Sequence, residues 1–499
     1  MAASRGPDLL IGVRERCRGV SGWQTRDTRP PTEVDDHEWR ALVAELAEWP
    51  LRSLTLQATS EGVTVQSGPN GGAPLYLVGN HRGLWAHWDP GQLYRWVSLD
   101  RPLDTCLASL FLATFDVPYS HRTLISGLHL LTQGCHAAWR AEDGHLRFRY
   151  PPTAGVPAEG TLRPGADVVD GVWRCLTSMM RRWPDHDLVG SELSSGLDSA
   201  LTTAALVACG RGAPARTYAM ALPPPGGDVQ AERRADLVSH FGTVDTALPM
   251  VGHEPFALGG SRARRTPVVP WEECYIEAAD ALLATAAADG VQVMVTGFGG
   301  DELCYPRSGG PHRHRPPATD ALPGHLTALT REALRDVPTA ADPAPPGVAF
   351  VSAVQVAATS SARYLRHGIW PVFPLAGPEI VRLCARLPKP WLRDRRLSRE
   401  LLSRAGVSRS VAFARDTDTF EPVMARGLRQ AWPRWLSGLW GDCRLADLGL
   451  IDPARFRADF ARWAASGAAD GTVPFYATIQ LELTLRSLDA HASGAIPPR

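Results

Sequence analysis

The segment Leu193-Ser-Ser-Gly-Leu-Asp-Ser199 decides the fold, because it lies where a short apolar strand passes into an alanine-rich helix. Its small residues let the backbone close around an anion, and the free N–H groups of the following helix point at that anion. The serine hydroxyls add donors, and Asp198 can hold a divalent cation that neutralises phosphate charge. A serine-rich loop with Asp198 as a helix N-cap explains the same residues. Taken alone, the segment leaves both interpretations open.

A second segment, Thr296-Gly-Phe-Gly-Gly-Asp-Glu-Leu303, also follows an apolar strand, and it presents Asp301 from a glycine-rich turn. In an open parallel sheet, ligands collect beyond the carboxyl ends of the strands. Two such loops, each with an aspartate, favour the anion-binding interpretation over the N-cap. The pair predicts a site for ATP and Mg²⁺.

Strands and helices alternate around these two segments. We expect strands at 187–193, 217–221 and 291–296, and helices at 199–209 and 229–241. This βαβ rhythm predicts an α/β fold with a doubly wound parallel sheet. The rest of the chain, towards its C-terminus, reads as mostly helical.

The first part of the chain reads as β-rich, with one amphipathic helix expected at 103–113. Turn residues divide alternating segments into three expected hairpins, at 53–67, 74–89 and 136–152. The stretch 151–165 is rich in proline and glycine. We therefore place a boundary there, between a domain of residues 1–160 and a domain of residues 161–499.

Composition excludes several classes of partner and site. The 499 residues carry a formal net charge of +0 at pH 7, so neither nucleic acid nor an anionic membrane is an expected partner. The nine cysteines form no Cys-x-x-Cys pair, which argues against zinc, redox and disulfide sites. Lys389 is the only lysine, so a phosphate loop ending in Gly-Lys is ruled out. The chain shows no signal pattern and no apolar run of membrane-spanning length, which predicts a cytoplasmic protein.

The two motifs resemble those of a known family. Ser194–Ser199 resembles the pyrophosphate loop, usually Ser-Gly-Gly-x-Asp-Ser, of the adenylating ATP pyrophosphatases. Gly297–Leu303 is similar to the second signature of their asparagine synthetase branch. The resemblance implies a glutaminase-like, β-rich α+β domain, followed by a doubly wound ATP-pyrophosphatase domain with helical additions. It also implies that Asp198 and Asp301 ligate Mg²⁺ and act in catalysis.

The resemblance further implies a set of contacts with ATP. Ser194, Gly196 and Ser199 would cradle the pyrophosphate, and Leu193 and Met220 would border the adenosine. The full implied set of nucleotide-binding residues is Leu193, Ser194, Ser195, Gly196, Leu197, Asp198, Ser199, Met220, Gly297, Phe298 and Gly299.

Departures from the family pattern narrow the function. Asparagine synthetases hydrolyse glutamine with an N-terminal cysteine, whereas position 2 here is Ala2, so glutaminase activity is not expected. In this respect the chain is similar to β-lactam synthetases and lasso-peptide macrolactam cyclases. Phe298 stands where β-lactam synthetases carry a tyrosine, and Trp370 stands where a later acid is expected. A Tyr–Glu pair that could accept a proton is therefore missing from these positions.

Another departure concerns the charge over the α-phosphate. The family places a lysine in a late Arg-x-Thr-Lys motif, and the matching stretch Arg415-Asp-Thr-Asp418 has an acid in the place of that lysine. We expect Arg415 or Arg399 to supply the missing charge, because a guanidinium is well shaped for phosphate oxygens. A slow or degenerate enzyme is the alternative.

Three functions follow from these residues. The first is an ATP-dependent cyclase that activates an Asp or Glu side chain as an acyl-adenylate and joins it to the N-terminal amine of a lasso-type peptide, with release of AMP and pyrophosphate. Its partners would be a precursor peptide, a leader peptidase and a leader-binding protein. The second is a synthetase that makes a β-lactam or another amide from a small acid. The third is a non-catalytic, peptide-binding homologue. The acceptor acid, the amine and the ring size stay open.

Overall fold

The structure is a computed structural model of the chain. It describes residues 2–15, 30–49, 51–68, 70, 74–153, 160–182, 188–210, 214–224, 226–264, 267–304, 322–345, 351–415 and 419–492.

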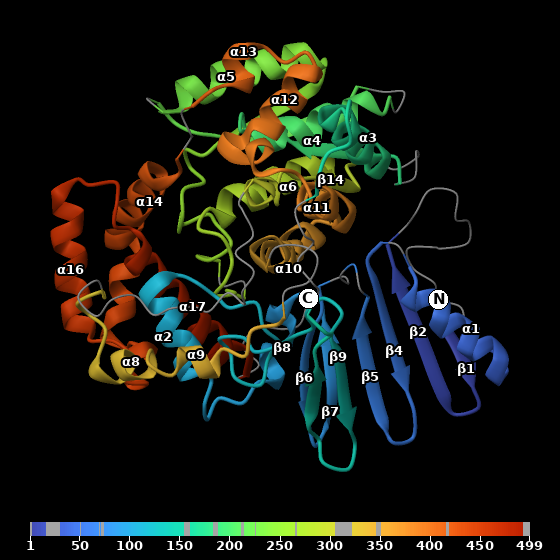
Figure 1. The fold of residues 1–499 in the computed structure, drawn as a ribbon. Helices are drawn as coiled ribbons and strands as arrows, with labels where there is room; N and C mark the ends of the chain where they lie inside the picture. Colours follow the sequence, from blue (N-terminus) through green and yellow to red (C-terminus); the bar gives the residue numbers. More distant parts are fainter. Residues whose placement is uncertain are drawn as a thin grey trace.

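The middle of the chain forms a five-stranded parallel sheet (Figure 1). Its spatial order is β13 (Val244–Pro249), β12 (Arg216–Ala221), β11 (Val189–Glu192), β14 (Val293–Val295) and β15 (Trp370–Val372). Every neighbouring pair in it is parallel, which confirms the predicted α/β fold with a parallel sheet. The strand order reverses between β11 and β14, and a sheet of this kind opens a crevice beyond the carboxyl ends of the strands at such a point.

Helices cover both faces of this sheet. β14 shows why: Val293 and Val295 pack with α3 (Val168–Met180) and α4 (Leu197–Ala208), whereas Met294 packs with α6 (Ile276–Ala288). Successive side chains of a strand point to opposite faces, so a strand that is apolar at every position is buried on both. All three residues of β14 are buried, as this arrangement requires.

The N-terminal part is β-rich, as predicted. A seven-stranded sheet has the order β10-β9-β5-β4-β2-β1-β3, and a three-stranded sheet has the order β7-β6-β8. The expected hairpins are β4 (Ser53–Ala58) with β5 (Gly62–Ser67), β6 (Tyr76–Asn80) with β7 (Gly83–His87), and β9 (His136–Arg140) with β10 (Leu146–Arg149). The other strands are β1 (Ala2–Arg5), β2 (Asp8–Arg14), β3 (Thr32–Glu33) and β8 (His129–Leu130). All three predicted hairpins are therefore present.

Two features of the strands differ from the sequence prediction. The sequence does not predict β1 and β2, which form a hairpin in which Ala2 pairs with Ile11. Gly6, in their turn, has φ 56°, a backbone angle that glycine adopts without strain. β15 lies in a part of the chain expected to be helical. It forms an edge of the parallel sheet, where the missing N–H of Pro371 does no harm.

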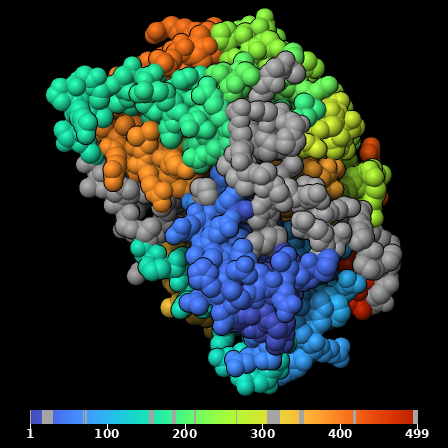
Figure 2. Space-filling model, turned by 90° about the vertical axis from the view of Figure 1, so that its right-hand side faces the viewer, coloured from blue at the N-terminus to red at the C-terminus, as the bar shows by residue number. Residues whose placement is uncertain are grey.

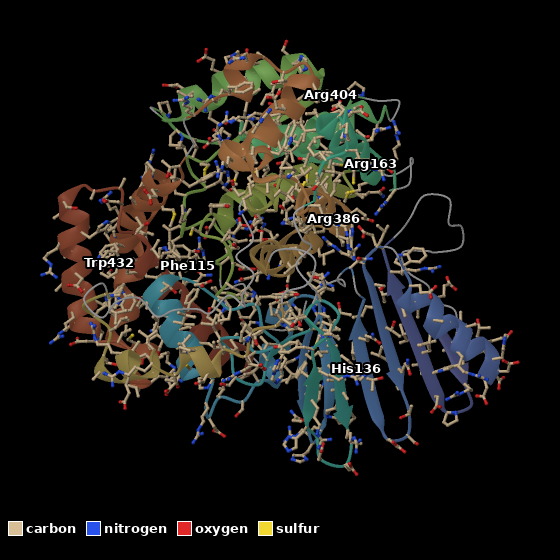
Figure 3. All side chains as sticks on the ribbon, in the orientation of Figure 1. Phe115, His136, Arg163, Arg386, Arg404 and Trp432 are labelled. Atoms are coloured by element: carbon tan, nitrogen blue, oxygen red, sulfur yellow. The ribbon has the colours of Figure 1, made fainter. Side chains whose placement is uncertain are left out.

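The largest buried core crosses the predicted boundary. The predicted helix is present as α2 (Thr105–Thr114), and it packs on α17 (Val473–Ala492) near the C-terminus. Phe115, at the end of α2, places its ring 5.1 Å from the ring of Tyr476 in an edge-on contact (Figure 3). The boundary at 151–165 stays a prediction, and residues 154–159 within it lie outside the described residues.

One face of the molecule shows the N-terminal strands, in blue, below green and orange residues of the parallel-sheet half (Figure 2). In Figure 1 the part of the molecule that contains the parallel sheet lies above the antiparallel sheets of the N-terminal part. Within the described ranges, none of the helices is long and apolar enough to cross a membrane.

Candidate active site

A cleft of about 1350 Å³ opens beside the loops that follow β11 and β14. The structure brings most of the predicted site residues to this cleft: Ser194, Ser195, Gly196, Leu197, Asp198, Ser199, Gly297, Phe298, Asp301, Arg399 and Arg415. The cleft therefore lies at the reversal point of the strand order, where a ligand is expected.

The first loop is closed by its own serines. Ser199 Oγ accepts a hydrogen bond from Ser194 N and donates one to Gly196 O, each at 3.1 Å, and it lies 3.1 Å from Ser194 Oγ. Gly196 is the N-cap of α4 and makes no side-chain cap bond, so no cap satisfies the first N–H groups of this 12-residue helix. An uncapped helix start beside a cleft is an anion-binding arrangement. Asp198 lies inside the first turn of α4, so its interpretation as an N-cap is wrong.

Glycines press the second loop against the first. A Cβ on Gly297 would lie 2.7 Å from Ser199 N, and a Cβ on Gly300 would lie 2.1 Å from the carboxyl carbon of Asp198. Any larger side chain would push the two loops apart. The glycine-rich turn therefore lets the second loop lie directly against Asp198 and Ser199.

Arg395 joins these two aspartates. Its Nη2 donates a hydrogen bond to Asp198 Oδ2 and lies 3.0 Å from Asp301 Oδ1. Asp394 and Arg395 both have positive φ, at 53° and 56°, immediately before α12 (Arg396–Arg404). The sequence gives no signal for this contact, because Arg395 is one of many arginines and lies almost two hundred residues beyond Asp198.

Burial raises the pKa of Asp198 to about 6, and Arg395 opposes that effect while Asp301 adds to it. Asp198 Oδ1 is buried and has no hydrogen-bond partner among the described residues. A buried carboxylate oxygen without a partner is costly, and a bound cation would satisfy it.

Mg²⁺ fits this pair of carboxylates. The described residues include no group of three or more His, Cys, Asp or Glu side chains that could hold a metal ion by themselves. Mg²⁺ does not need one, because it commonly binds through one or two carboxylates together with substrate phosphates and waters. Asp198 and Asp301 would hold the ion, with phosphate oxygens beside the first loop.

The cleft is rich in cationic side chains. Among the described residues that line it, seven are arginines: Arg233, Arg393, Arg395, Arg396, Arg399, Arg409 and Arg415. The carboxylates in the same lining are Glu192, Asp198, Asp301 and Asp394. An excess of guanidinium groups around an uncapped helix start favours a ligand with several negative charges.

The two arginines expected to replace the missing lysine differ in their contacts. Arg399 donates hydrogen bonds to the carbonyls of Asp394, Ala412 and Ala414, each at 3.0 Å. Its guanidinium therefore links the backbone just before α12 to the backbone at Ala412 and Ala414. Arg415 is exposed and lines the cleft. Asp418, in the place of the family lysine, lies outside the described residues.

Three predicted nucleotide contacts are absent from the described lining of the cleft. The side chain of Leu193 is 0% exposed and belongs to the core between α3 and α4. Met220 packs against the core around α6. Gly299 has φ 97°, and a Cβ there would lie 2.7 Å from Ala376 N, so this glycine serves the path of the loop. Their contacts with ATP remain predictions.

Phe298 and Trp370 do not meet. Phe298 lines the cleft, with its ring 5.9 Å from the ring of Phe373. Trp370 lies in β15, and its Nε1 donates a hydrogen bond to Glu15 Oε1 at 2.7 Å. Glu15 follows β2, so Trp370 belongs to the contact between the parallel sheet and the N-terminal sheet.

A different Tyr–Glu pair, which the sequence does not reveal, borders the cleft. Tyr364, in α10 (Val351–Arg366), donates its hydroxyl to Glu192 Oε1 at 2.6 Å. Glu192 lines the cleft, and burial raises the pKa of its carboxyl. The two residues are 172 positions apart, so only the fold brings them together.

A family of known proteins matches the part of the chain that contains the two loops of this site. Residues 177–364 match the family model described as asparagine synthase. This range contains both motif loops, Asp198 and Asp301, whereas Arg395, Arg399 and Arg415 lie beyond it. No curated protein matches the chain. The match supports an asparagine synthetase-like family for this segment, and it indicates an ATP-using ligase.

Proposed function

We propose that the protein forms an amide bond by activating a carboxylate as an acyl-adenylate, and that its product is the macrolactam of a lasso-type peptide. One observation carries the proposal: the uncapped start of α4 and the Asp198–Asp301 pair share one arginine-lined cleft. The cleft volume of about 1350 Å³ exceeds the roughly 300–1,000 Å³ usual for a small-ligand site. This size leaves room for a peptide beside a nucleotide.

The first step transfers AMP. A carboxylate oxygen of an Asp or Glu side chain of the peptide attacks the α-phosphorus of ATP, and the bond to the pyrophosphate oxygen breaks. The backbone N–H groups at the start of α4 and the guanidinium groups of the cleft would receive the charge of the leaving pyrophosphate. Bound Mg²⁺ would supply further charge neutralisation at Asp198 and Asp301.

The second step forms the amide. The N-terminal amine attacks the acyl carbon, AMP leaves, and the amine loses a proton. The peptide has then lost one water overall. An α-amine has a pKa of about 7.7–8.0, so a large fraction is already neutral near pH 7.5. Packing of Phe298 against Phe373, without a base at that position, is compatible with such an amine.

We expect three partners for this reaction: the precursor peptide, a leader peptidase that frees the amine, and a leader-binding protein that delivers the precursor. A small acid as the substrate is the alternative within the same chemistry. The Tyr364–Glu192 pair favours this alternative. An amine that is a weaker nucleophile than the α-amine of a peptide needs a proton acceptor close by.

A non-catalytic, peptide-binding role is the third candidate. The bridge from Arg395 to Asp198 and Asp301 favours it, because a guanidinium already lies where a metal ion would bind. An inactive homologue would keep this bridge permanently.

The test measures nucleotide and peptide together. Purified protein receives ATP, Mg²⁺ and a candidate core peptide, and AMP, pyrophosphate and peptide mass are read from the same sample. We expect AMP, pyrophosphate and a peptide lighter by one water, and none of these with Asp198→Ala. Nucleotide products with a small acid but no peptide would favour the small-acid synthetase. Peptide binding without any nucleotide turnover would favour the non-catalytic role.

A further inference from the structure

We propose that Arg395 guards the metal position of the nucleotide-free enzyme and moves onto the phosphates when ATP and Mg²⁺ bind. This inference rests on the proposed ATP-dependent function, and it assigns to Arg395 the phosphate contact that the sequence motif expects from a lysine. One nitrogen of the Arg395 guanidinium, Nη2, contacts Asp198 Oδ2 and lies 3.0 Å from Asp301 Oδ1, so a cation already bridges the two carboxylates.

The guanidinium and a metal ion cannot share this position. Mg²⁺ bound to Asp198 and Asp301 would use the oxygens that Arg395 now contacts. Two cations a few ångströms apart repel each other strongly at a half-buried site. Arg395 must therefore leave before the metal ion can enter, and its positive charge must find other acceptors.

In the present position of Arg395, neither its guanidinium nor the Asp198 carboxylate makes all of its hydrogen bonds. Among the described residues, Asp198 Oδ1 and Arg395 Nε are both buried without a hydrogen-bond partner. A metal ion would use the free oxygen, and a phosphate group would accept a pair of N–H groups from the guanidinium. The exchange therefore improves the bonding on both sides.

The backbone at Arg395 is also strained. Asp394 and Arg395 have φ values of 53° and 56°, in the left-handed region that side chains other than glycine disfavour. Two consecutive residues of this kind are unusual, and such strain occurs at sites whose conformation changes with function. A change at this junction would redirect Arg395 without disturbing α12.

Arg395 suits the phosphate contact better than the two arginines expected from the sequence. Arg399 already donates hydrogen bonds to three backbone carbonyls. Arg415 is exposed, and within the described part of the chain its side chain contacts neither aspartate. Among the described arginines, Arg395 alone contacts Asp198 and Asp301, beside which the phosphates of ATP would lie.

The experiment compares metal binding with nucleotide binding, without turnover. Binding of Mn²⁺ alone is measured by electron paramagnetic resonance, and binding of α,β-methylene-ATP with Mg²⁺ is measured by calorimetry. The variants are Arg395→Gln, Arg395→Lys and the control Arg404→Gln. Arg404 lies at the other end of α12, away from the two aspartates, and it pairs with Asp170 at 2.6 Å (Figure 3).

We expect opposite shifts in the two affinities. Arg395→Gln binds Mn²⁺ about tenfold more tightly, because the competing charge is gone. It binds the nucleotide complex about tenfold more weakly, because a phosphate contact is lost. Arg395→Lys lies between the wild type and Arg395→Gln in both affinities, and it decides the outcome if Arg395→Gln does not fold. Arg404→Gln matches the wild type in both.

Two results would overturn the inference. An unchanged or weaker Mn²⁺ affinity in Arg395→Gln would show that Arg395 does not guard the metal position. An unchanged nucleotide affinity would show that it does not contact the phosphates. Either result, with nucleotide binding intact in the wild type, leaves the proposed function standing. Failure of the wild type itself to bind the nucleotide complex would instead remove the proposed function.

Discussion

Ser195 has a backbone angle that is costly for a serine. Its φ is 103°, and it stands where the family loop usually has glycine. For residues other than glycine, left-handed conformations cost about 1–2 kcal/mol, whereas glycine adopts them freely. The loop Ser194–Ser199 therefore carries strain that a single substitution can remove.

We expect Ser195→Gly to be more stable than Ser195→Ala by about 1 kcal/mol. Both variants lose the hydroxyl, but only glycine relieves the strain, and part of that gain is offset by the greater freedom of glycine in the unfolded chain. Chemical denaturation of the two variants measures the difference. Equal unfolding free energies would mean that the loop holds Ser195 without strain.

At the scale of elements, α10 is linked to the central strand β11 by a hydrogen bond from a buried tyrosine. The side chain of Tyr364 is 0% exposed, and its hydroxyl donates to the carboxylate of Glu192 at 2.6 Å. Hydrogen bonds to charged groups contribute about 1.5–3 kcal/mol, against about 0.5–1.5 kcal/mol for neutral pairs. This bond therefore holds the helix and fixes Glu192 at the edge of the cleft.

Tyr364→Phe should lower the free energy of unfolding by about 1.5–3 kcal/mol, since it leaves Glu192 without its donor. The matched control is Tyr94→Phe. The hydroxyl of Tyr94 is also buried, but it donates to the neutral carbonyl of Val268 at 2.7 Å, so we expect a cost of about 0.5–1.5 kcal/mol. Denaturant unfolding of both variants gives the comparison. Equal costs would indicate that Glu192 is protonated in the folded protein.

Some of these elements can be predicted from the sequence, and others cannot. Hairpins and the two motif loops are local features, set by turn residues and by apolar runs, so they can be predicted from nearby residues. β15 has only three residues and contains a proline, and neither feature signals a strand. Its existence depends on pairing with β14, a distant partner.

The candidate site divides in the same way. The residues from Ser194 to Ser199 and Asp301 could be named from the motifs because each motif is continuous in sequence. The bridge from Arg395 and the donor for Glu192 could not, because both depend on residues brought together across the fold. Arginine is so frequent in this chain that its position in the sequence carries almost no information.

At the scale of the whole molecule, a buried ion cluster joins the N-terminal sheets to the half of the molecule that contains the parallel sheet. Arg366 in α10 contacts Asp89 through two hydrogen bonds of 2.8 and 2.9 Å, and it contacts Glu272 at 2.5 Å. Both carboxylate side chains are 8% exposed. Removing one member of a buried ionic cluster leaves uncompensated charge, which commonly costs 3–5 kcal/mol.

We expect Arg366→Met to lower the unfolding free energy by about 3–5 kcal/mol, because two buried carboxylates lose their common partner. Arg455→Met is the control. Its side chain is 72% exposed and pairs with Asp452, the N-cap of its own helix, so its loss should cost about 1 kcal/mol or less. Thermal unfolding of the two variants measures the contrast. Similar costs would mean that water reaches the Arg366 cluster.

A histidine in a turn, buried against Phe456 and Phe475 of the C-terminal helices, makes the stability of the whole molecule depend on pH. The side chain of His325 is 1% exposed, its Nε2 lies 3.1 Å from Thr478 Oγ1, and its Nδ1 lies 3.7 Å from Asp459. Burial lowers its pKa from 6.5 to about 4, although Asp459 opposes that shift. The folded protein therefore keeps this imidazole neutral at a pH where the unfolded chain protonates it.

The direction of this pH dependence follows from proton uptake by the unfolded chain. Below pH 6.5 the unfolded state binds a proton that the folded state does not accept until about pH 4, so stability falls as the pH is lowered through this window. The shift corresponds to at most about 3 kcal/mol. His325→Gln keeps a donor for Thr478 and does not titrate. We therefore expect the variant to be less stable than the wild type at pH 7.5 and to approach it as the pH falls to 4.5, in denaturant unfolding at each pH. Other groups titrate in both proteins and cancel in the difference, so parallel stability curves would show that His325 is protonated in the folded protein.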